Sequence, residues 1–334
     1  MNRRYISFAA ITVLLIAAFY MSMITGTVKM TPAEVFAALS GKGAGTMENG
    51  VILSIRLPRT VSAIILGGAL ALSGYMLQTF FNNPIVGPFV LGISSGAKLT
   101  VALALISFMA RGYTPGSLFL VGAAFAGALF AMFFVLLISV KVRSMGILVV
   151  CGIMVGYICS AATDIIITFA DDADIANLHN WSMGSLSGMN GKDVAIMSVI
   201  VGICLIASVF LAKPIGAYRL GEAYAASGGV NITLLRVLLI FISSLLAATV
   251  SAFAGPISFV GIAVPHLLSG MTGTASPKIM IPGSFMLGAL VTLSCDCIAR
   301  TVFAPAEVSI SSVTAVLLVP VVIAVMINRR KECR

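Results

Sequence analysis

Long apolar segments separated by short polar loops run the whole length of the chain. About 20 apolar residues, at a helical rise of about 1.5 Å per residue, are enough to cross the hydrocarbon core of a bilayer. We delimit ten such segments, near residues 6–25, 59–80, 93–109, 117–140, 146–169, 193–212, 232–253, 257–270, 281–300 and 310–327. The third and the eighth are short, which indicates tilted or broken helices. The pattern predicts an all-α polytopic membrane protein of about ten transmembrane helices, built as a single domain over residues 1–334.

Two polar loops carry signals for short helices. Thr31 followed by Pro32 is typical of a helix start, and predicts a short helix after the first span. The loop over residues 213–231 is the largest of the basic loops. There Pro214 and Gly216 are expected to break the incoming helix, and residues 220–227 are compatible with a new one. Two glycines, at positions 228 and 229, would end it as a C-cap.

Composition and charge agree with a membrane protein. Of the 334 residues, 60% are hydrophobic and 9% are charged, whereas a soluble domain carries about 25% charged residues. The apolar runs do not alternate strictly with polar residues, which excludes an outer-membrane barrel with strands of about 10 residues. The net charge of +9 does not require a nucleic-acid partner, because Lys and Arg collect in the cytoplasmic loops of membrane proteins.

The distribution of charged residues predicts the orientation. With ten spans, one side holds both termini and the loops with Lys141, Lys213, Arg219 and Lys278, and we expect this side to face the cytoplasm. The opposite side holds most of the acidic residues, but Arg56 and Arg59 also lie there.

The segment from Arg56 to Ala97 carries several unusual features together. It opens with RLPR and continues with an apolar run in which Gly67 and Ala71 stand four residues apart. This is the small-xxx-small spacing that lets membrane helices approach closely. Gln78 ends the apolar run, and the NNPIVGP sequence that follows predicts a turn.

Three stretches give the chain a resemblance to a known family. RLPR with NNPIVGP and LGISSGA, then AGPISFVGIAVPHLLSG over residues 254–270, then LGALVTLSCDCIAR over residues 287–300 resemble the FecCD-type permeases. These are the membrane subunits of type II ABC importers for iron–siderophore complexes, haem or cobalamin. Ser269 stands where the family usually has an arginine, and the last span lacks the usual Gly-rich pattern.

The resemblance implies a multi-subunit importer in the bacterial inner membrane. It implies the type II importer permease fold, two separate ATPase subunits, a second permease copy or paralogue, and an extracytoplasmic binding protein. The cargo would be a metal chelate, most commonly an iron–siderophore complex. The sequence contains no G-x-x-x-x-G-K-[ST] phosphate-binding loop, so ATP hydrolysis is expected on another chain rather than on this one. No cofactor or resident metal is expected.

The resemblance also assigns candidate functional residues. The cytoplasmic loop over residues 213–231 would couple to the ATPase through Arg219, Leu220, Gly221, Glu222, Ala226 and Gly228. The binding protein would offer carboxylates to Arg56, Arg59 and Arg300 on the external side. The translocation path or its gate would include Gly67, Gly74, Gln78, Asn82, Asn83 and Pro84.

An ion-coupled secondary transporter is the alternative. Asp164 and Asp296 lie within apolar spans, where an ionisable residue is a functional candidate. Arg300, four residues after Asp296, is the expected partner of that carboxylate.

Overall fold

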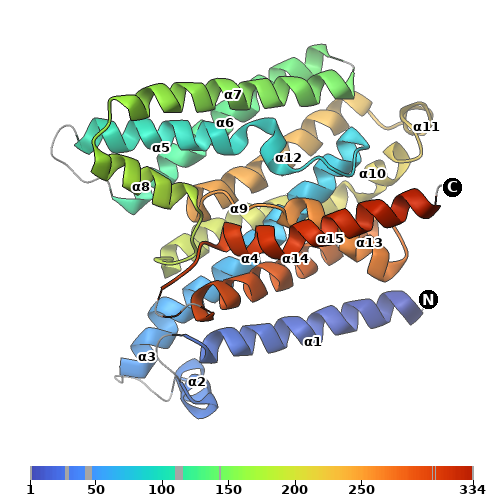
Figure 1. Ribbon diagram of the computed structural model, residues 1–334. Coiled ribbons are helices and arrows are strands. Elements are labelled where there is room, and N and C mark those ends of the chain that lie inside the picture. The colour runs from blue at the N-terminus through green and yellow to red at the C-terminus, as the bar shows by residue number, and fades with distance from the viewer. Residues whose placement is uncertain are drawn as a thin grey trace.

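The computed structural model describes residues 2–26, 30–41, 47–109, 116–142, 144–302, 304 and 306–332, and the regular elements among them are all helical. Figure 1 shows the helices running roughly alongside one another as a bundle. In chain order, the elements are α1 (Asn2–Ile24), α2 (Pro32–Leu39), α3 (Met47–Val51), the π-helical turn η1 (Ile52–Arg56), α4 (Leu57–Phe81), the 3₁₀ turn η2 (Pro88–Leu91), α5 (Ile93–Met109), α6 (Ser117–Lys141), α7 (Met145–Thr168), α8 (Asp172–Ser182), α9 (Gly191–Phe210), α10 (Ala212–Tyr218), α11 (Glu222–Ser227), α12 (Ile232–Ala254), α13 (Val260–Thr272), α14 (Pro277–Thr301) and α15 (Ile310–Glu332).

The ten predicted spans correspond to helices in the structure. Among the described residues, seven helical stretches are long and apolar enough to cross a membrane, namely Arg3–Ile24, Met47–Phe81, Ser117–Ser139, Met145–Thr168, Gly191–Phe210, Ile232–Ala254 and Pro277–Thr301. Three shorter apolar helices, Ile93–Phe108, Val260–Thr272 and Ile310–Ala324, match the remaining segments. The all-α polytopic fold is therefore confirmed, and the third and eighth spans are short as predicted.

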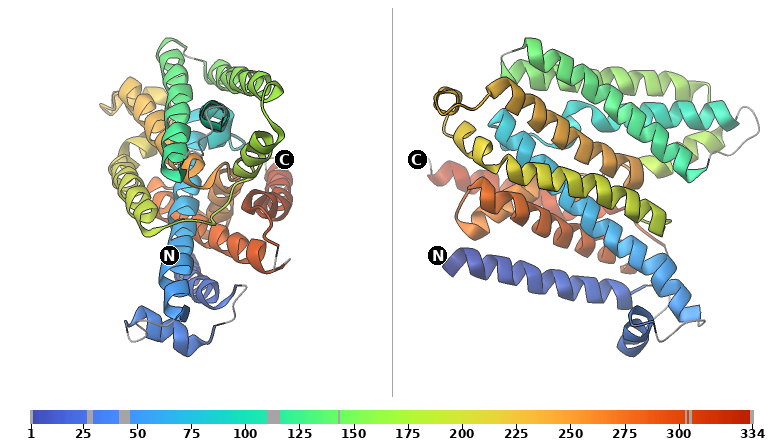
Figure 2. Two further views of the ribbon diagram at one scale, coloured as in Figure 1. Left: turned by 90° about the vertical axis from the view of Figure 1, so that its left-hand side faces the viewer. Right: turned by 180° about the vertical axis from the view of Figure 1, so that it is seen from behind.

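Helix α4 lies at the centre of the molecule. It crosses the middle of the bundle in Figure 1 and in both views of Figure 2, and it packs against α14, α12 and α13. Most of its side chains from Pro58 to Phe81 are buried. A helix that is apolar on every face belongs in the interior of a bundle, which explains why this segment lacks a polar stripe.

Glycines set the closest approaches of α4 to its neighbours. Gly67 crosses Gly288 of α14, where an added Cβ would overlap the Gly288 carbonyl oxygen and the Thr292 side chain. Gly74 crosses Gly261 of α13, and a Cβ there would overlap the Gly261 backbone. The small-residue spacing read from the sequence thus marks helix contacts within this chain.

Short elements at the ends of the bundle follow local sequence signals. Helix α2 begins after Thr31, as the Thr-Pro signal predicts, and Thr31 also forms a capping box with Glu34. The predicted break near Pro214 and Gly216 is wrong in detail. The chain breaks earlier, at Leu211, and α10 runs through both residues. Pro214 is tolerated because it lies in the first turn of α10, where its missing N–H has no helical partner.

The bundle has two chemically different ends. In Figure 1, both chain termini lie at the same end as α10 and α11, and α2, α3 and α8 lie at the opposite end. The first end carries Arg3, Lys141, Lys213, Arg219 and Lys278, and we call it the basic end. The other carries Glu34, Glu48, Asp171, Asp172, Asp174 and Glu307, and we call it the acidic end.

Candidate functional site

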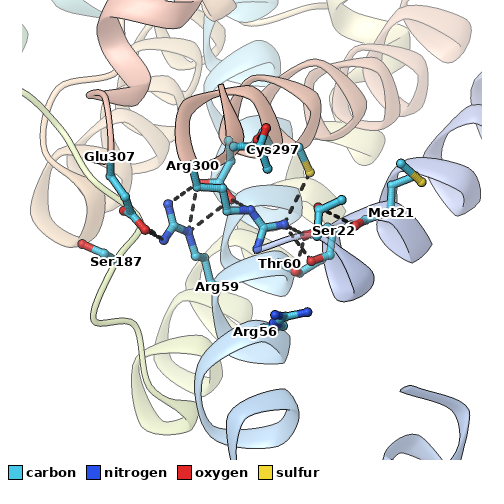
Figure 3. Close-up of polar contacts among 12 residues, drawn as sticks. Met21, Ser22, Arg56, Arg59, Thr60, Ser187, Cys297, Arg300 and Glu307 are labelled. Atoms are coloured by element: carbon cyan, nitrogen blue, oxygen red, sulfur yellow. Dashed lines mark hydrogen bonds and ion pairs between the residues drawn. The ribbon is translucent and has the colours of Figure 1, made fainter. Parts of the chain in front are cut away.

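A buried ionic centre lies at the acidic end, where α4 begins and α14 ends. Arg59 lies one residue after Pro58, in the first turn of α4. Its Nη2 donates to Oδ1 of Asp296 at 2.9 Å and its Nε donates to the same oxygen at 3.0 Å. Its Nη1 donates to Oε1 of Glu307 at 2.9 Å (Figure 3). One guanidinium thus joins α4, α14 and the loop before α15, because its planar fork can serve two carboxylates at once.

The other two arginines bind the carbonyl end of α1. Arg300 Nη2 donates to the Ser22 carbonyl oxygen at 2.7 Å and to its hydroxyl at 2.6 Å (Figure 3). Arg56 Nη1 donates to the carbonyl oxygens of Met23 at 2.5 Å and Ile24 at 2.9 Å. The last carbonyls of a helix have no helical partner and attract cations, so these two arginines stabilise the end of the first span.

The structure therefore changes the interpretation of these residues. Arg56, Arg59 and Arg300 do lie close together, but all three are buried and have partners within the chain. The expected pairing of Asp296 with Arg300 is secondary, because their closest atoms are 3.7 Å apart and Arg59 holds the carboxylate more closely. A docking role for the three arginines stays a prediction.

Glu307 is the residue of this centre that the sequence reasoning missed. Its side chain is 41% exposed, whereas that of Asp296 is 1% exposed. Together with Arg59, Ser185 and Ser187 it lines a cavity of about 280 Å³ between the loop after α8 and the start of α15. Glu307 is therefore the member of the ionic centre whose side chain is most accessible from the cavity. The sequence signal was its place in a loop on the same side as Arg59.

A second cavity, of about 230 Å³, lies at the basic end, between the end of α4, α13 and the start of α14. It brings together four residues expected at the gate, Gln78, Asn82, Asn83 and Pro84. Arg219, expected to couple to the ATPase, lines the same cavity, as does Ser269. The candidate gate and the candidate coupling loop are thus neighbours in space, although about 140 residues separate them in the chain.

Hydrogen bonds hold the turn after α4 against α13. Gln78 Nε2 donates to the Ile262 carbonyl oxygen at 3.1 Å, and His266 Nε2 donates to the Pro84 carbonyl oxygen at 2.8 Å. Asn82 ends α4 in the left-handed region with φ of 46°, a conformation that Asn adopts more readily than most residues. His266 therefore serves as a hydrogen-bonded residue at this turn.

The coupling loop forms two short helices, α10 and α11, joined at Gly221. Gly221 has φ of 127°, which favours glycine. The Tyr218 hydroxyl donates to Oε1 of Glu222 at 2.9 Å, and Arg236 of α12 forms an ion pair with the same carboxylate. The hydrogen bond from Arg236 holds the pKa of the Glu222 carboxyl below its ordinary value. Burial, assisted by the Glu222 carboxylate, raises the pKa of Tyr218 to about 12.

Two apolar side chains are exposed at the link between α10 and α11 and on α11 itself. Leu220 is 71% exposed and Tyr224 is 60% exposed, whereas Ala225 between α11 and the bundle is fully buried. Ala226 and Gly228 are exposed beside them. The loop is thus anchored on one face and presents an apolar surface on the other.

Three other sequence candidates lie elsewhere. Gly67 and Gly74 pack against α14 and α13 within the chain, so their place on a translocation path stays a prediction. Asp164 is exposed on α7, where the Thr168 hydroxyl donates to its backbone carbonyl oxygen at 2.9 Å.

Comparison with known proteins gives the family. The chain belongs to the FecCD transport family, which matches residues 14–328. The vitamin B12 import system permease protein BtuC of Klebsiella pneumoniae subsp. pneumoniae is 33% identical over 324 residues, covering 96% of this chain and 93% of that protein. The protein of the same name from Citrobacter koseri is 31% identical over 331 residues, covering 99% and 96%.

Solved structures agree with this assignment. A metal-chelate type ABC transporter in an inward-facing conformation superposes with a TM-score of 0.84 at 27% identity, covering 97% of this chain and 99% of that one. PsaBC from Streptococcus pneumoniae, in complex with a Fab, shares the fold with a TM-score of 0.53 at 16% identity. The fold and family define the chain as a membrane permease of the type II ABC importer class.

Proposed function

We propose that this chain forms the membrane path of an ATP-driven importer for a metal chelate. The observation that carries the proposal is the exposed apolar pair of Leu220 and Tyr224, at the link after α10 and on α11. This pair lies in the same loop as Arg219, which lines the polar cavity that contains the candidate gate residues. Movement of these helices by an ATPase subunit would act directly on Arg219, which lies in the same cavity as Gln78 and Asn82. ATP hydrolysis takes place on two separate ATPase chains.

The orientation follows from the charges at the two ends. The basic end, with both termini, faces the cytoplasm, because Lys and Arg are enriched in cytoplasmic loops. The acidic end, with the ionic centre around Arg59, faces the binding protein outside a bacterial inner membrane. A second permease copy, or a paralogue, completes the path.

A metal chelate is the cargo class that the comparisons support. The relatives are named for vitamin B12, which is itself a cobalt chelate, and the structural neighbour is described as a metal-chelate type transporter. Within this class, the family resemblance of the sequence favours an iron–siderophore complex, and haem belongs to the class as well.

The cargo is tested by ATP-dependent uptake in vesicles that contain the complete complex with its binding protein. Cobalamin, a ferric siderophore and haem are supplied in turn. The proposal predicts ATP-dependent accumulation of one of these chelates. Accumulation of none of them, in a complex whose ATPase is active, would contradict it.

Docking of the binding protein is proposed at the cavity lined by Arg59 and Glu307. An incoming carboxylate would compete with Glu307 for Nη1 of Arg59, because Glu307 is the exposed partner and Asp296 the buried one. Reversing the charge of Arg59 would break the buried pair as well, so Glu307→Gln is the cleaner variant.

Glu307→Gln should speed association of the loaded binding protein at low salt, and the gain should fade as salt screens the charges. Asp172→Asn, which removes one exposed charge from α8 at the same end, controls for the general change in field. Equal association rates in the two variants would remove Arg59 from the docking site.

A further inference from the structure

An apolar groove with a basic rim lies on the side of the bundle at the basic end. It lies between the end of α9, the start of α10 and the start of α14, and has a volume of about 420 Å³. Val209, Phe210, Ile281 and Pro282 form its apolar wall, and Lys213 and Lys278 lie at its rim. Lys213 is the first residue of the coupling loop, and the other five residues belong to neither the ionic centre nor the cavity with the candidate gate residues.

The position of the groove places it at the level of lipid head groups. Both α9 and α14 are membrane spans, and the groove lies where α9 ends and α14 begins. Phe210 is 80% exposed at this point. In a bilayer, the apolar wall would lie against acyl chains, and the two lysines would lie where the lipid phosphates are.

The positive charge of the rim is not balanced within the described part of the chain. Lys213 and Lys278 are both exposed, and none of the ion pairs found there involves either of them. Glu222, an acidic residue of the same end, is already engaged by Arg236 and Tyr218. An anion at the rim would therefore meet two cations without displacing an existing partner.

The start of α14 adds to this excess. Lys278 lies in its first turn, which contains no acidic residue, and the N-cap Ser276 makes no side-chain capping bond. A helix N-terminus carries a partial positive charge, so a lysine there is unfavourable unless an anion lies nearby. The positive rim and the apolar wall together fit an amphiphilic ligand with a negatively charged head group.

We propose that this groove binds an anionic phospholipid, with its phosphate between Lys213 and Lys278 and an acyl chain along Phe210 and Ile281. Because Lys213 belongs to α10, the lipid links the start of the coupling loop to α14. The assignment depends on the two lysines and the apolar wall, and it holds whatever cargo the importer carries.

Fluorescence quenching tests the proposal on the full chain. Phe210→Trp places an indole on the wall, while the native Trp181 lies at the acidic end and supplies the reference signal. The protein is placed in phosphatidylcholine nanodiscs that contain either brominated phosphatidylglycerol or brominated phosphatidylcholine at equal mole fraction. We expect several-fold greater enrichment of the anionic lipid at the introduced indole, since each lysine at a membrane surface favours an anionic lipid about fivefold.

The lysines are then tested directly. Lys213→Gln with Lys278→Gln in the Phe210→Trp background should abolish the preference for phosphatidylglycerol. Lys141→Gln, which removes an exposed lysine from α6 at the same end, should leave it intact. Equal quenching by the two lipids, or a preference that survives the double substitution, would overturn the proposal. Protection of the indole from both lipids by added ATPase subunits would also overturn it, because it would make the groove a protein contact.

Discussion

Arg59 forms ion pairs with two carboxylates that differ in exposure. The buried one, Asp296, has a structural role, and the exposed one, Glu307, can be reached from outside the chain. Asp296 is buried and holds one edge of the guanidinium, while Glu307 meets another edge from a cavity. Removing one partner of a buried pair costs about 3–5 kcal/mol, because it leaves the other charge uncompensated. The Arg59–Asp296 pair should therefore be needed for a stable fold, whereas Glu307 can be changed more safely.

The first prediction follows from this difference. Asp296→Asn should lower the free energy of unfolding by about 3 kcal/mol or more, because Arg59 and Arg300 lose their common buried carboxylate. Unfolding of the purified chain in detergent, followed by circular dichroism, measures the loss. Asp172→Asn, at an exposed position of α8, should change it little. Equal stability of the two variants would mean that the pair contributes nothing.

At the residue scale, the sequence predicted which charged residues gather at this end, but not which of them form pairs. RLPR and the Asp296–Arg300 spacing pointed to arginines and an acid on the same side of the membrane. The pairing of Arg59 with Asp296 joins positions 237 residues apart, and that with Glu307 joins positions 248 apart. Local spacing favoured Arg300, which instead reaches the carbonyl end of α1. Only the packing of α1, α4 and α14 decides between these partners.

At Gly67 and Gly74, helix α4 packs so closely against its neighbours that a side chain larger than hydrogen would overlap them. Gly74→Ala should destabilise the fold by about 1–3 kcal/mol, because its Cβ would overlap the backbone of Gly261. Gly202→Ala on α9 is the matched control, since no atom lies within 4 Å of the Cβ it would add. That control should be neutral or slightly stabilising. Thermal unfolding in detergent compares the two, and an unaffected Gly74→Ala variant would contradict the close crossing.

Two adjacent alanines of α11 allow the exposed face of this helix to be tested separately from the face that packs on the bundle. Ala226→Glu places a charge on the exposed face of α11, so the chain should still fold while stimulation of the ATPase and uptake are lost. Ala225→Glu, one residue earlier, buries a charge at a position with no exposed surface and should lower stability instead. Size-exclusion profiles and ATPase rates of reconstituted complexes separate the outcomes. Full stimulation in a folded Ala226→Glu variant would take α11 out of the contact.

Elements with a strong local signal could be predicted closely, and those set by packing could not. The spans follow from apolar length, and α2 follows from Thr31 and Pro32. The break before α10 falls three residues before Pro214, because a proline fits the first turn of a helix as well as it ends one. The exposed face of α11 was also not visible in the sequence, since adjacent alanines at 225 and 226 differ only in what lies against them.

At the scale of the whole molecule, the proposed docking site and the proposed gate belong to different ends of the bundle. The ionic centre at the acidic end and the cavity with Gln78 and Arg219 at the basic end lie at opposite ends of the same central helix, α4. The family and the fold confirm the interpretation as an importer permease. The ion-coupled alternative is not favoured, because the matching family and the similar solved structure are those of ABC importers. The Asp296 carboxylate is moreover paired with Arg59.

The most direct test compares the two energy sources in one preparation. The chain is reconstituted in vesicles with its ATPase and binding protein, and uptake of the metal chelate is measured with ATP on the side of the basic end, or with an imposed proton gradient and no ATP. The account predicts uptake with ATP alone, none with the gradient alone, and retention of ATP-driven uptake in Asp164→Asn. Uptake driven by the gradient in vesicles that lack the ATPase, and lost in Asp164→Asn, would contradict it.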